Sequence, residues 1–193
     1  MKKILCFGDS NTYGFNPVDL SRYDKATRWS GILSNKFNII EAGCNNRCIF
    51  NNNGNFNSLK TIPKYLTNDL DYIILQVGIN DLQFGYNVSL ETFKNKLAEL
   101  LELINPKIKV ILLCPNVISQ SLLNSYFSTL FDESSIEKSK KLPEIYQEVS
   151  KNFNCLYVNL NNIVKVSEVD GLHYDSKNHK ILADYLSTQF YQN

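Results

Sequence analysis

The sequence carries almost no net charge and no long apolar run. Twenty basic and nineteen acidic residues leave a formal charge of +1, which gives no electrostatic case for nucleic-acid binding. Lys138, Lys140 and Lys141 lie among acidic residues, as is typical of a solvated helix face. No run approaches the roughly 18 apolar residues that a membrane helix needs. We therefore expect neither a nucleic acid nor a membrane as partner.

An export signal is not apparent at the start of the chain. The apolar run at 4–7 is too short for a signal peptide, and no small-residue cleavage site follows it. The default expectation is a cytoplasmic location.

The chain is poor in the residues that build metal sites and disulfide frameworks. It has two histidines and an odd number of scattered cysteines, which favours free thiols in the core over disulfides. So few histidines and such scattered cysteines make a zinc site improbable, so neither a metal nor another cofactor is expected. The cysteines are Cys6, Cys44, Cys48, Cys114 and Cys155.

Apolar runs of strand length alternate with segments of helical period along the whole chain. Strands are expected at 2–7, 38–42, 72–77, 108–114 and 155–158. Helical patterns are expected at 29–37, 58–66, 89–104, 133–153 and 177–190, two of them interrupted by Pro63 and Pro143. This order is typical of α/β proteins.

The run YIILQV at 72–77 is apolar throughout, as expected for a strand buried on both faces. Such strands, alternating with helices, indicate a parallel sheet that is covered on both sides. The chain has 193 residues, with no repeat and no linker. We therefore expect one α/β domain that spans residues 1–193.

Four polar clusters follow the expected strands or precede the last helix. They lie at 8–10, 43–47, 78–81 and 170–175. Ligands of open α/β sheets bind outside the carboxyl ends of the strands. The sequence therefore predicts that the four clusters meet at one edge of the sheet.

Ser10 is the candidate nucleophile, and it needs a base to remove its proton. Asp170 stands three residues before His173, a spacing at which its carboxylate reaches the imidazole Nδ1–H and leaves Nε2 to face the serine. His179 lies inside the last expected helix without such an acid, which favours a role as a helix-surface or packing residue. We predict a triad of Ser10, His173 and Asp170.

Asn80 is the candidate donor to the oxygen that becomes negative during acyl transfer. One such donor typically contributes about 3 kcal/mol. Backbone N–H groups in turns are the other usual donors, and Ser10 and Asn46 both lie in turn-prone sequence. The neighbouring Asp81 has two interpretations, a cap on its own loop or a residue that orients the surroundings of Ser10.

The sequence offers several candidates for the walls of the pocket. Candidates for substrate binding are Asn11, Thr12, Tyr13 and Trp29, together with the connection 116–131. That connection is long and apolar for a loop, as substrate-contacting loops often are. A small extra helix packed on the core is an equally good interpretation of it.

At these residues the chain resembles the SGNH hydrolases, also called GDSL-type esterases and lipases. The segments FGDSNTYG, EAGCNNR, QVGINDL and DGLHYD are similar to the four blocks of that family, in the same order and over the whole chain. The pair Arg28-Trp29 and the pattern GDSxTxG are similar to the arylesterase/acyltransferase-like branch.

This resemblance implies a role for each matching residue. Ser10 would be the nucleophile, His173 the base and Asp170 its partner, with an oxyanion hole formed by the N–H groups of Ser10 and Asn46 and by the Asn80 side chain. It also implies a three-layer, flavodoxin-like α/β sandwich with a five-stranded parallel sheet. Asn46 stands where the family usually has a small residue. Because the donor there is a main-chain N–H, the expected effect is on the size of the acyl pocket.

The expected activity is hydrolysis of small carboxylic esters with short acyl groups such as acetyl, through an acyl-enzyme on Ser10. Transfer of the acyl group to an alcohol would follow if the loops exclude water. A small ester is the expected partner, and the sequence leaves a homo-oligomer open.

Two other classes of protein fit part of the pattern. A flavodoxin-like module could bind a phosphate or nucleotide with the hydroxyls of Ser10 and Thr12, but the loop has little glycine and Asp170 and His173 would have no task. A receiver-like domain could use Asp9 as phospho-acceptor, but the accompanying acidic pair is missing.

Overall fold

The architecture is a parallel sheet whose strands all end at one edge of the molecule. The computed structural model describes residues 1–153 and 155–190. The strand order is β2-β1-β3-β4-β5, and every pair of neighbours is parallel. The strands are β1 (Lys3–Gly8), β2 (Asn38–Gly43), β3 (Tyr72–Gln76), β4 (Lys109–Cys114) and β5 (Leu156–Asn159). The predicted five-stranded parallel sheet is confirmed, with strand ends that differ from the expected ones by one residue.

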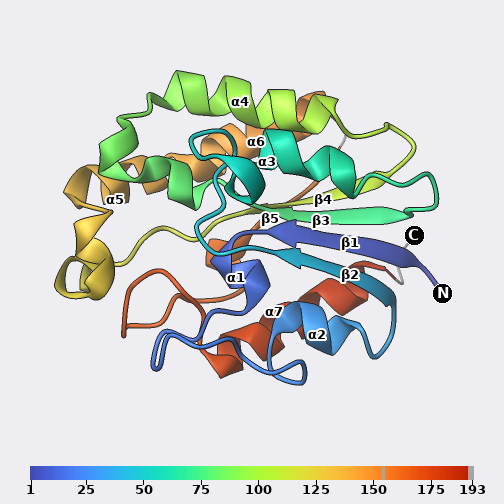
Figure 1. Cartoon of the computed structure of the whole chain (residues 1–193), viewed down its shortest axis with the longest axis horizontal. Coiled ribbons are helices and arrows are strands. Elements are labelled where there is room, and N and C mark those ends of the chain that lie inside the picture. The colour runs from blue at the N-terminus through green and yellow to red at the C-terminus, as the bar shows by residue number, and fades with distance from the viewer. Residues whose placement is uncertain (154, 191–193) are drawn as a thin grey trace.

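Helices cover both faces of the sheet and complete the predicted three layers (Figure 1). α2 and α7 pack on one face, and α3, α4 and α6 on the other. The helices are α1 (Ser10–Tyr13), α2 (Trp29–Leu33), α3 (Ser58–Thr61), α4 (Leu90–Glu102), α5 (Glu133–Ser139), α6 (Leu142–Asn152) and α7 (Ser176–Gln189). None of the described helices is both long and apolar enough to cross a bilayer.

The alternation of side chains along β1 divides the core into two clusters. Leu5 and Phe7 belong to the cluster on the α4 side, whereas Ile4 and Cys6 belong to the cluster on the α7 side. All four side chains are fully buried, as expected for a strand covered on both faces. The sheet is therefore held in place from two sides.

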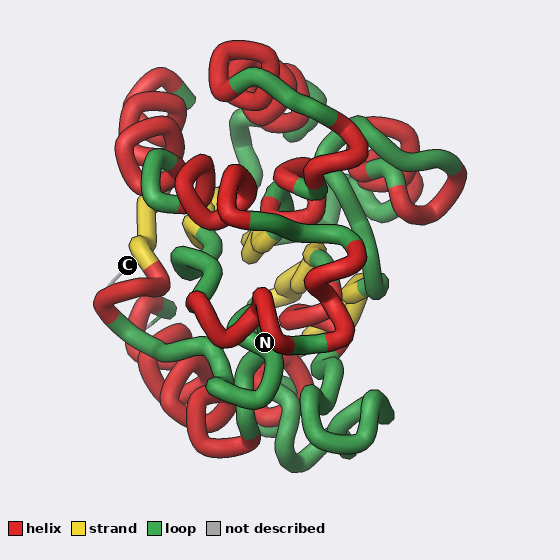
Figure 2. Tube along the Cα trace, turned by 90° about the vertical axis from the view of Figure 1, so that its left-hand side faces the viewer, coloured by secondary structure: helices red, strands yellow, loops and turns green. Residues whose placement is uncertain are grey.

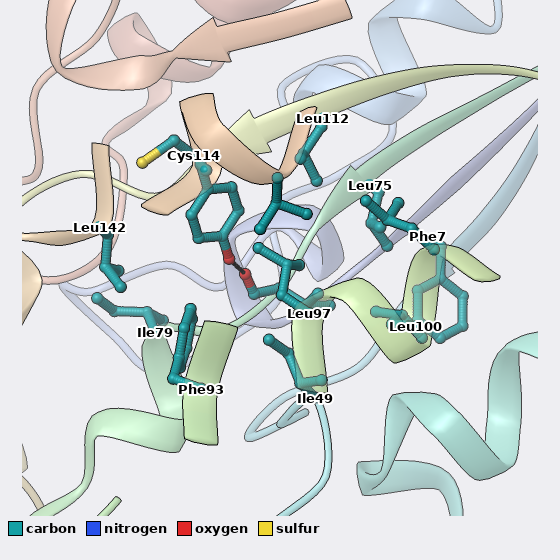
Figure 3. Packing of buried hydrophobic residues seen from close by; sticks show 14 of the residues in the cluster. Phe7, Ile49, Leu75, Ile79, Phe93, Leu97, Leu100, Leu112, Cys114 and Leu142 are labelled. Carbon is teal, nitrogen blue, oxygen red and sulfur yellow. Dashed lines mark hydrogen bonds between the residues drawn. The ribbon is translucent and has the colours of Figure 1, made fainter. Parts of the chain in front are cut away.

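The larger cluster fills the space between the sheet and α4 (Figure 3). Leu75 and Leu112 extend from the strands, and Phe93 and Leu97 extend from α4 to meet them. Each of these four side chains is fully buried. Full burial of such a side chain stabilises the fold by roughly 1.5–3 kcal/mol. This cluster therefore stabilises the packing of α4 on the sheet.

Three of the expected helices are shorter than their sequence patterns. α2 ends at Leu33 because the chain turns before β2, and α3 continues only as a 3-10 turn around Pro63. The pattern at 133–153 divides into α5 and α6, and Pro143 lies in the first turn of α6, where its missing N–H costs no hydrogen bond. α4 begins where Ser89 accepts a hydrogen bond from the Thr92 N–H.

The two edges of the sheet differ in character. At the carboxyl edge, the register pairs Gly8 with both Gly43 and Gln76, and loops and short helical turns surround the strand ends (Figure 2). At the opposite edge, the Lys2 Nζ donates a hydrogen bond of 2.7 Å to the Phe190 carbonyl. The polar clusters found in the sequence follow the strands at the carboxyl edge.

Candidate active site

Ser10 lies at the start of a short helix, directly after β1. The Asp9 carboxylate caps this helix by accepting from the Asn11 N–H at 3.0 Å. A Cβ on Gly8 would lie 2.0 Å from the Thr12 hydroxyl and 2.6 Å from the Gln76 carbonyl, so only glycine fits there. This close turn directs Ser10 toward the loops at the strand ends.

The segment before α7 brings a histidine and an aspartate to Ser10. The His173 Nε2 lies 2.8 Å from the Ser10 Oγ, across 163 positions of sequence. The His173 Nδ1 lies 2.6 Å from an Asp170 carboxylate oxygen. All three side chains are buried. The structure thus places the three predicted triad residues in a single hydrogen-bonded chain.

The surroundings of the Asp170 carboxylate favour its ionised form. Burial works against ionisation, but hydrogen bonds from the His173 ring and from the Leu172 and His173 N–H groups hold the pKa of Asp170 below its usual value. An ionised carboxylate fixes the ring tautomer with the proton on Nδ1 and stabilises the imidazolium when it forms. His173 is therefore oriented with Nε2 toward the serine.

Three N–H donors border the space in front of Ser10. The Asn80 amide is buried at the cavity and donates one hydrogen bond of 3.1 Å to the Arg47 carbonyl. Asn46 has a left-handed backbone with φ of 58°, and asparagine tolerates this conformation better than most residues. Within the described parts of the chain, the N–H groups of Ser10 and Asn46 donate to no protein acceptor. All three donors belong to residues that line the cavity.

The cavity beside Ser10 has a volume of about 180 Å³. Its apolar wall includes three residues of the 116–131 connection, which forms two 3-10 turns, Gln120–Asn124 and Tyr126–Thr129. That connection therefore lines the pocket, and its short helical turns also pack on the core through Leu122, so each interpretation of it holds in part. The lining residues are Ser10, Phe15, Asn45, Asn46, Asn80, Phe127, Leu130, Phe131, Leu172 and His173.

Two phenylalanines pack against the His173 ring. The ring centroid of Phe15 lies 4.4 Å from that of His173, and the centroid of Phe127 lies 5.1 Å from it. The two phenylalanine rings also meet edge to face at 5.9 Å. Phe127 comes from the 116–131 connection, so this loop covers the histidine with apolar surface.

The four predicted substrate-binding residues are not among those that line the cavity. Thr12 is fully buried and its hydroxyl donates to the Gln76 side chain at 3.0 Å. The fully buried Trp29 donates its indole N–H to the Asn11 carbonyl at 3.0 Å, and Tyr13 stacks under the Arg22 guanidinium. Asn11, Thr12 and Trp29 are thus buried in the interior, whereas Tyr13 is only partly buried.

Asp81 and Arg47 support the loops around the cavity. The Asp81 carboxylate accepts from the Ile49 N–H at 2.6 Å and from the Asn51 amide at 3.0 Å. It therefore holds the loop at 49–51 in place and not its own loop. Arg47 is buried, donates to the carbonyls of Gly8 and Ala42, and lies over the Phe7 ring. The sequence analysis did not identify Arg47 as a supporting residue. The feature that could have pointed to it is that Arg47 is the only basic residue in the polar cluster at 43–47.

His179 lies apart from the cavity. It is fully buried, and its Nδ1 accepts from the Trp29 N–H at 3.4 Å. Burial lowers the pKa of His179 to about 4, so the ring is neutral at neutral pH. Its contacts are those of a packing residue.

The remaining features give no sign of a metal or disulfide site. All five cysteines are free thiols. No group of three or more histidine, cysteine or acidic side chains within residues 1–153 and 155–190 could hold a metal ion. A larger hollow of about 600 Å³ lies near the start of β3 and β4, at the opposite edge, and includes none of the predicted site residues.

A family model described as the GDSL-like lipase/acylhydrolase family matches residues 6–181. The chain belongs to this GDSL-like family. The predicted family is thereby confirmed, and the chain is an esterase-type serine hydrolase. No curated protein matches the chain in sequence.

Solved structures show that the GDSL-like fold extends over the full chain. The native aryl esterase of M. smegmatis is 22% identical, with a TM-score of 0.89, and the match covers 100% of this chain and 99% of that one. Est24, a carbohydrate acetylesterase from Sinorhizobium meliloti, is 23% identical, with the same TM-score and the same coverage of both chains. At these identities the likeness concerns the fold.

Proposed function

We propose that this GDSL-like enzyme cleaves small carboxylic esters by acyl transfer to Ser10. The observation that supports this most strongly is the 2.8 Å contact between the His173 Nε2 and the Ser10 Oγ, with Asp170 on the far side of the ring. A serine so paired loses its proton to the histidine as it attacks. The same histidine then carries that proton to the leaving alcohol.

The N–H donors would stabilise the charge that develops on the ester oxygen. In the proposed tetrahedral intermediate this oxygen receives hydrogen bonds from the Ser10 and Asn46 main chain and from the Asn80 side chain. The donors are held before substrate arrives, Asn80 by the Arg47 carbonyl and Asn46 by its left-handed turn. Such preorganised donors act where charge appears and need no rearrangement.

The cavity favours a short acyl group. Its volume of about 180 Å³ is small beside the roughly 300–1,000 Å³ of typical ligand pockets. The apolar residues Phe127, Leu130 and Phe131 form part of its wall, and polar residues such as Asn46 and Asn80 form another part. We propose acetyl and similar esters as substrates, in keeping with the aryl esterase and carbohydrate acetylesterase that share the fold.

The acyl-enzyme would be released by water or by another alcohol. The cover of Phe15 and Phe127 on His173 limits the water that reaches the base, which favours an alcohol that binds in the apolar cavity. We propose acyl transfer as a second outcome of the same intermediate. The proposed setting is the cytoplasm, with a small-molecule ester as partner.

The binding-module alternatives find no support in the geometry. The Thr12 hydroxyl is fully buried against Gln76, so it does not face a ligand beside Ser10. The Asp9 carboxylate is 1% exposed and caps α1, which leaves it inaccessible as a phospho-acceptor.

Hydrolysis of p-nitrophenyl acetate by the wild type and by Ser10→Ala and His173→Ala tests the proposal. Loss of either group should lower kcat by several powers of ten, and mass spectrometry of quenched wild-type enzyme should show an acetyl group on Ser10. Near-native turnover by Ser10→Ala would disprove the assigned nucleophile.

A further inference from the structure

The Asn11 side chain connects two segments of the site. One is the turn after β1 that carries Ser10, and the other is the segment 167–175 that carries His173, here called the histidine loop. Its Nδ2 donates to the Leu172 carbonyl at 3.1 Å, and its Oδ1 accepts from the Tyr174 N–H at 3.0 Å. Both bonds are buried and span more than 160 positions of sequence. The residues that Asn11 contacts stand immediately before and after His173.

The two peptide groups that adjoin the His173 Cα are thereby fully hydrogen-bonded. In the peptide group before it, Asn11 binds the carbonyl and Asp170 accepts from the N–H at 3.0 Å. In the peptide group after it, Asn11 binds the N–H, and the carbonyl accepts from the Ser167 N–H at 2.7 Å. One side chain thus supplies two of the four bonds that fix the backbone of the base.

Asn11 is itself rigidly held. Its N–H donates to Asp9 at 3.0 Å, and its carbonyl accepts from the Trp29 indole at 3.0 Å. Its side chain is 6% exposed and does not line the cavity. The two hydrogen bonds from the Asn11 side chain to Leu172 and Tyr174 act as a clamp on the histidine loop. Because Asn11 follows Ser10 directly, any movement of this clamp would alter the distance between Ser10 and His173.

We propose that Asn11 is a positioning residue that sets the Ser10–His173 distance. This inference rests on the proposed function, and it replaces the substrate-binding role expected for Asn11. A leucine at position 11 has a similar volume but neither donates nor accepts, so Leu172 and Tyr174 would lose their partners. A base displaced by about 1 Å can cost about a hundredfold in rate.

The test compares Asn11→Leu with Asn57→Leu. Asn57 is a matched control because it is 4% exposed, and its amide donates to the Phe50 and Asn52 carbonyls at 2.7 and 2.9 Å. Among the described residues, Asn57 makes no hydrogen bond to the segment 167–175. For Asn11→Leu we expect kcat on p-nitrophenyl acetate to fall about a hundredfold with KM nearly unchanged. Phosphonylation of Ser10 by a fluorophosphonate should slow in parallel.

Thermal melting separates positioning from stability. Both variants should melt at lower temperature, but Asn57→Leu should keep the wild-type kcat. If Asn11→Leu does not fold, the smaller Asn11→Ser, whose hydroxyl is too short to hold both backbone groups, takes its place. Wild-type kcat in a folded Asn11 variant, or an equal loss of kcat in Asn57→Leu, would overturn the positioning role. Absence of hydrolysis and labelling in the wild type would instead overturn the proposed function.

Discussion

The Gln83 side chain donates a hydrogen bond of 2.6 Å to the Oδ1 of Asn46, a residue that lines the cavity. This contact fixes the position of the Asn46 side chain. The Asn46 backbone has φ of 58°, a left-handed conformation that glycine adopts without strain. Asn46 therefore lines the cavity with a residue that is less relaxed than glycine at this position.

Replacing Asn46 by glycine should widen the range of acyl groups. We expect Asn46→Gly to retain its main-chain donor and to hydrolyse p-nitrophenyl acetate at near the wild-type rate. The ratio of kcat/KM for butyrate to that for acetate should rise about tenfold, since one or two methylenes in an apolar pocket typically give discrimination of this size. An unchanged ratio would show that Asn46 does not limit the acyl group.

Replacing Asn80 by alanine tests the oxyanion hole. Asn80→Ala removes an amide that is fixed by the Arg47 carbonyl at the cavity. We expect kcat to fall by about 10²–10³ with a small change in KM, as for other single donors of this kind. Steady-state kinetics on p-nitrophenyl acetate, with circular dichroism to verify folding, would measure this. A kcat within a factor of two of wild type would remove Asn80 from the oxyanion hole.

Replacing Phe127 by alanine should shift the acyl-enzyme from alcohols toward water. Phe127 covers the His173 ring at a centroid distance of 5.1 Å and lines the cavity. Without it, water reaches the base more easily and an apolar alcohol loses contact area. The ratio of butyl acetate to acetate formed from p-nitrophenyl acetate in aqueous butanol should fall. Tyr126→Ala is the control, because Tyr126 is 75% exposed and does not line the cavity.

Replacing Asp9 by asparagine should change how stability depends on pH. Burial raises the pKa of Asp9 from 3.8 to about 7, and the Asn11 N–H and Arg47 lower it only in part. Between these values the folded state binds more protons than the unfolded state, so this carboxyl lowers the free energy of unfolding as pH rises from about 4 to about 7. Asparagine keeps the helix cap without ionising.

We expect the stability of Asp9→Asn relative to wild type to increase with pH across that window and to level off above it. Each pKa unit corresponds to about 1.4 kcal/mol. Urea denaturation at pH 4, 5.5, 7 and 8 would measure the difference. Asp132→Asn is the control, since Asp132 caps α5 but is only partly buried and has a lowered pKa, so its difference should stay flat above pH 5. A flat difference for Asp9→Asn as well would contradict the expectation.

The parts of the fold and site that the sequence predicted share one property: they depend on local pattern. Continuous apolar runs such as 72–77 identified the strands, and strand ends identified the polar clusters around Ser10 and Asn80. The carboxylate three residues before His173 lies where its spacing predicted, at 2.6 Å from the ring.

The parts that the sequence did not predict depend on contacts between distant segments. Trp29 and Thr12 were expected at the pocket wall, yet both are fully buried. The sequence does not show which way a side chain turns. The clamp of Asn11 on the histidine loop joins residues more than 160 positions apart. Arg47 lies under two strand ends whose pairing only the folded sheet creates.

The hydrogen bond from Lys2 to the Phe190 carbonyl has a practical consequence. It brings the beginning of β1 and the end of α7 together on the side of the sheet that faces away from Ser10 (Figure 1). A support or fluorophore coupled through this region would leave the entrance to the cavity unobstructed, so the catalyst could be immobilised there in a defined orientation.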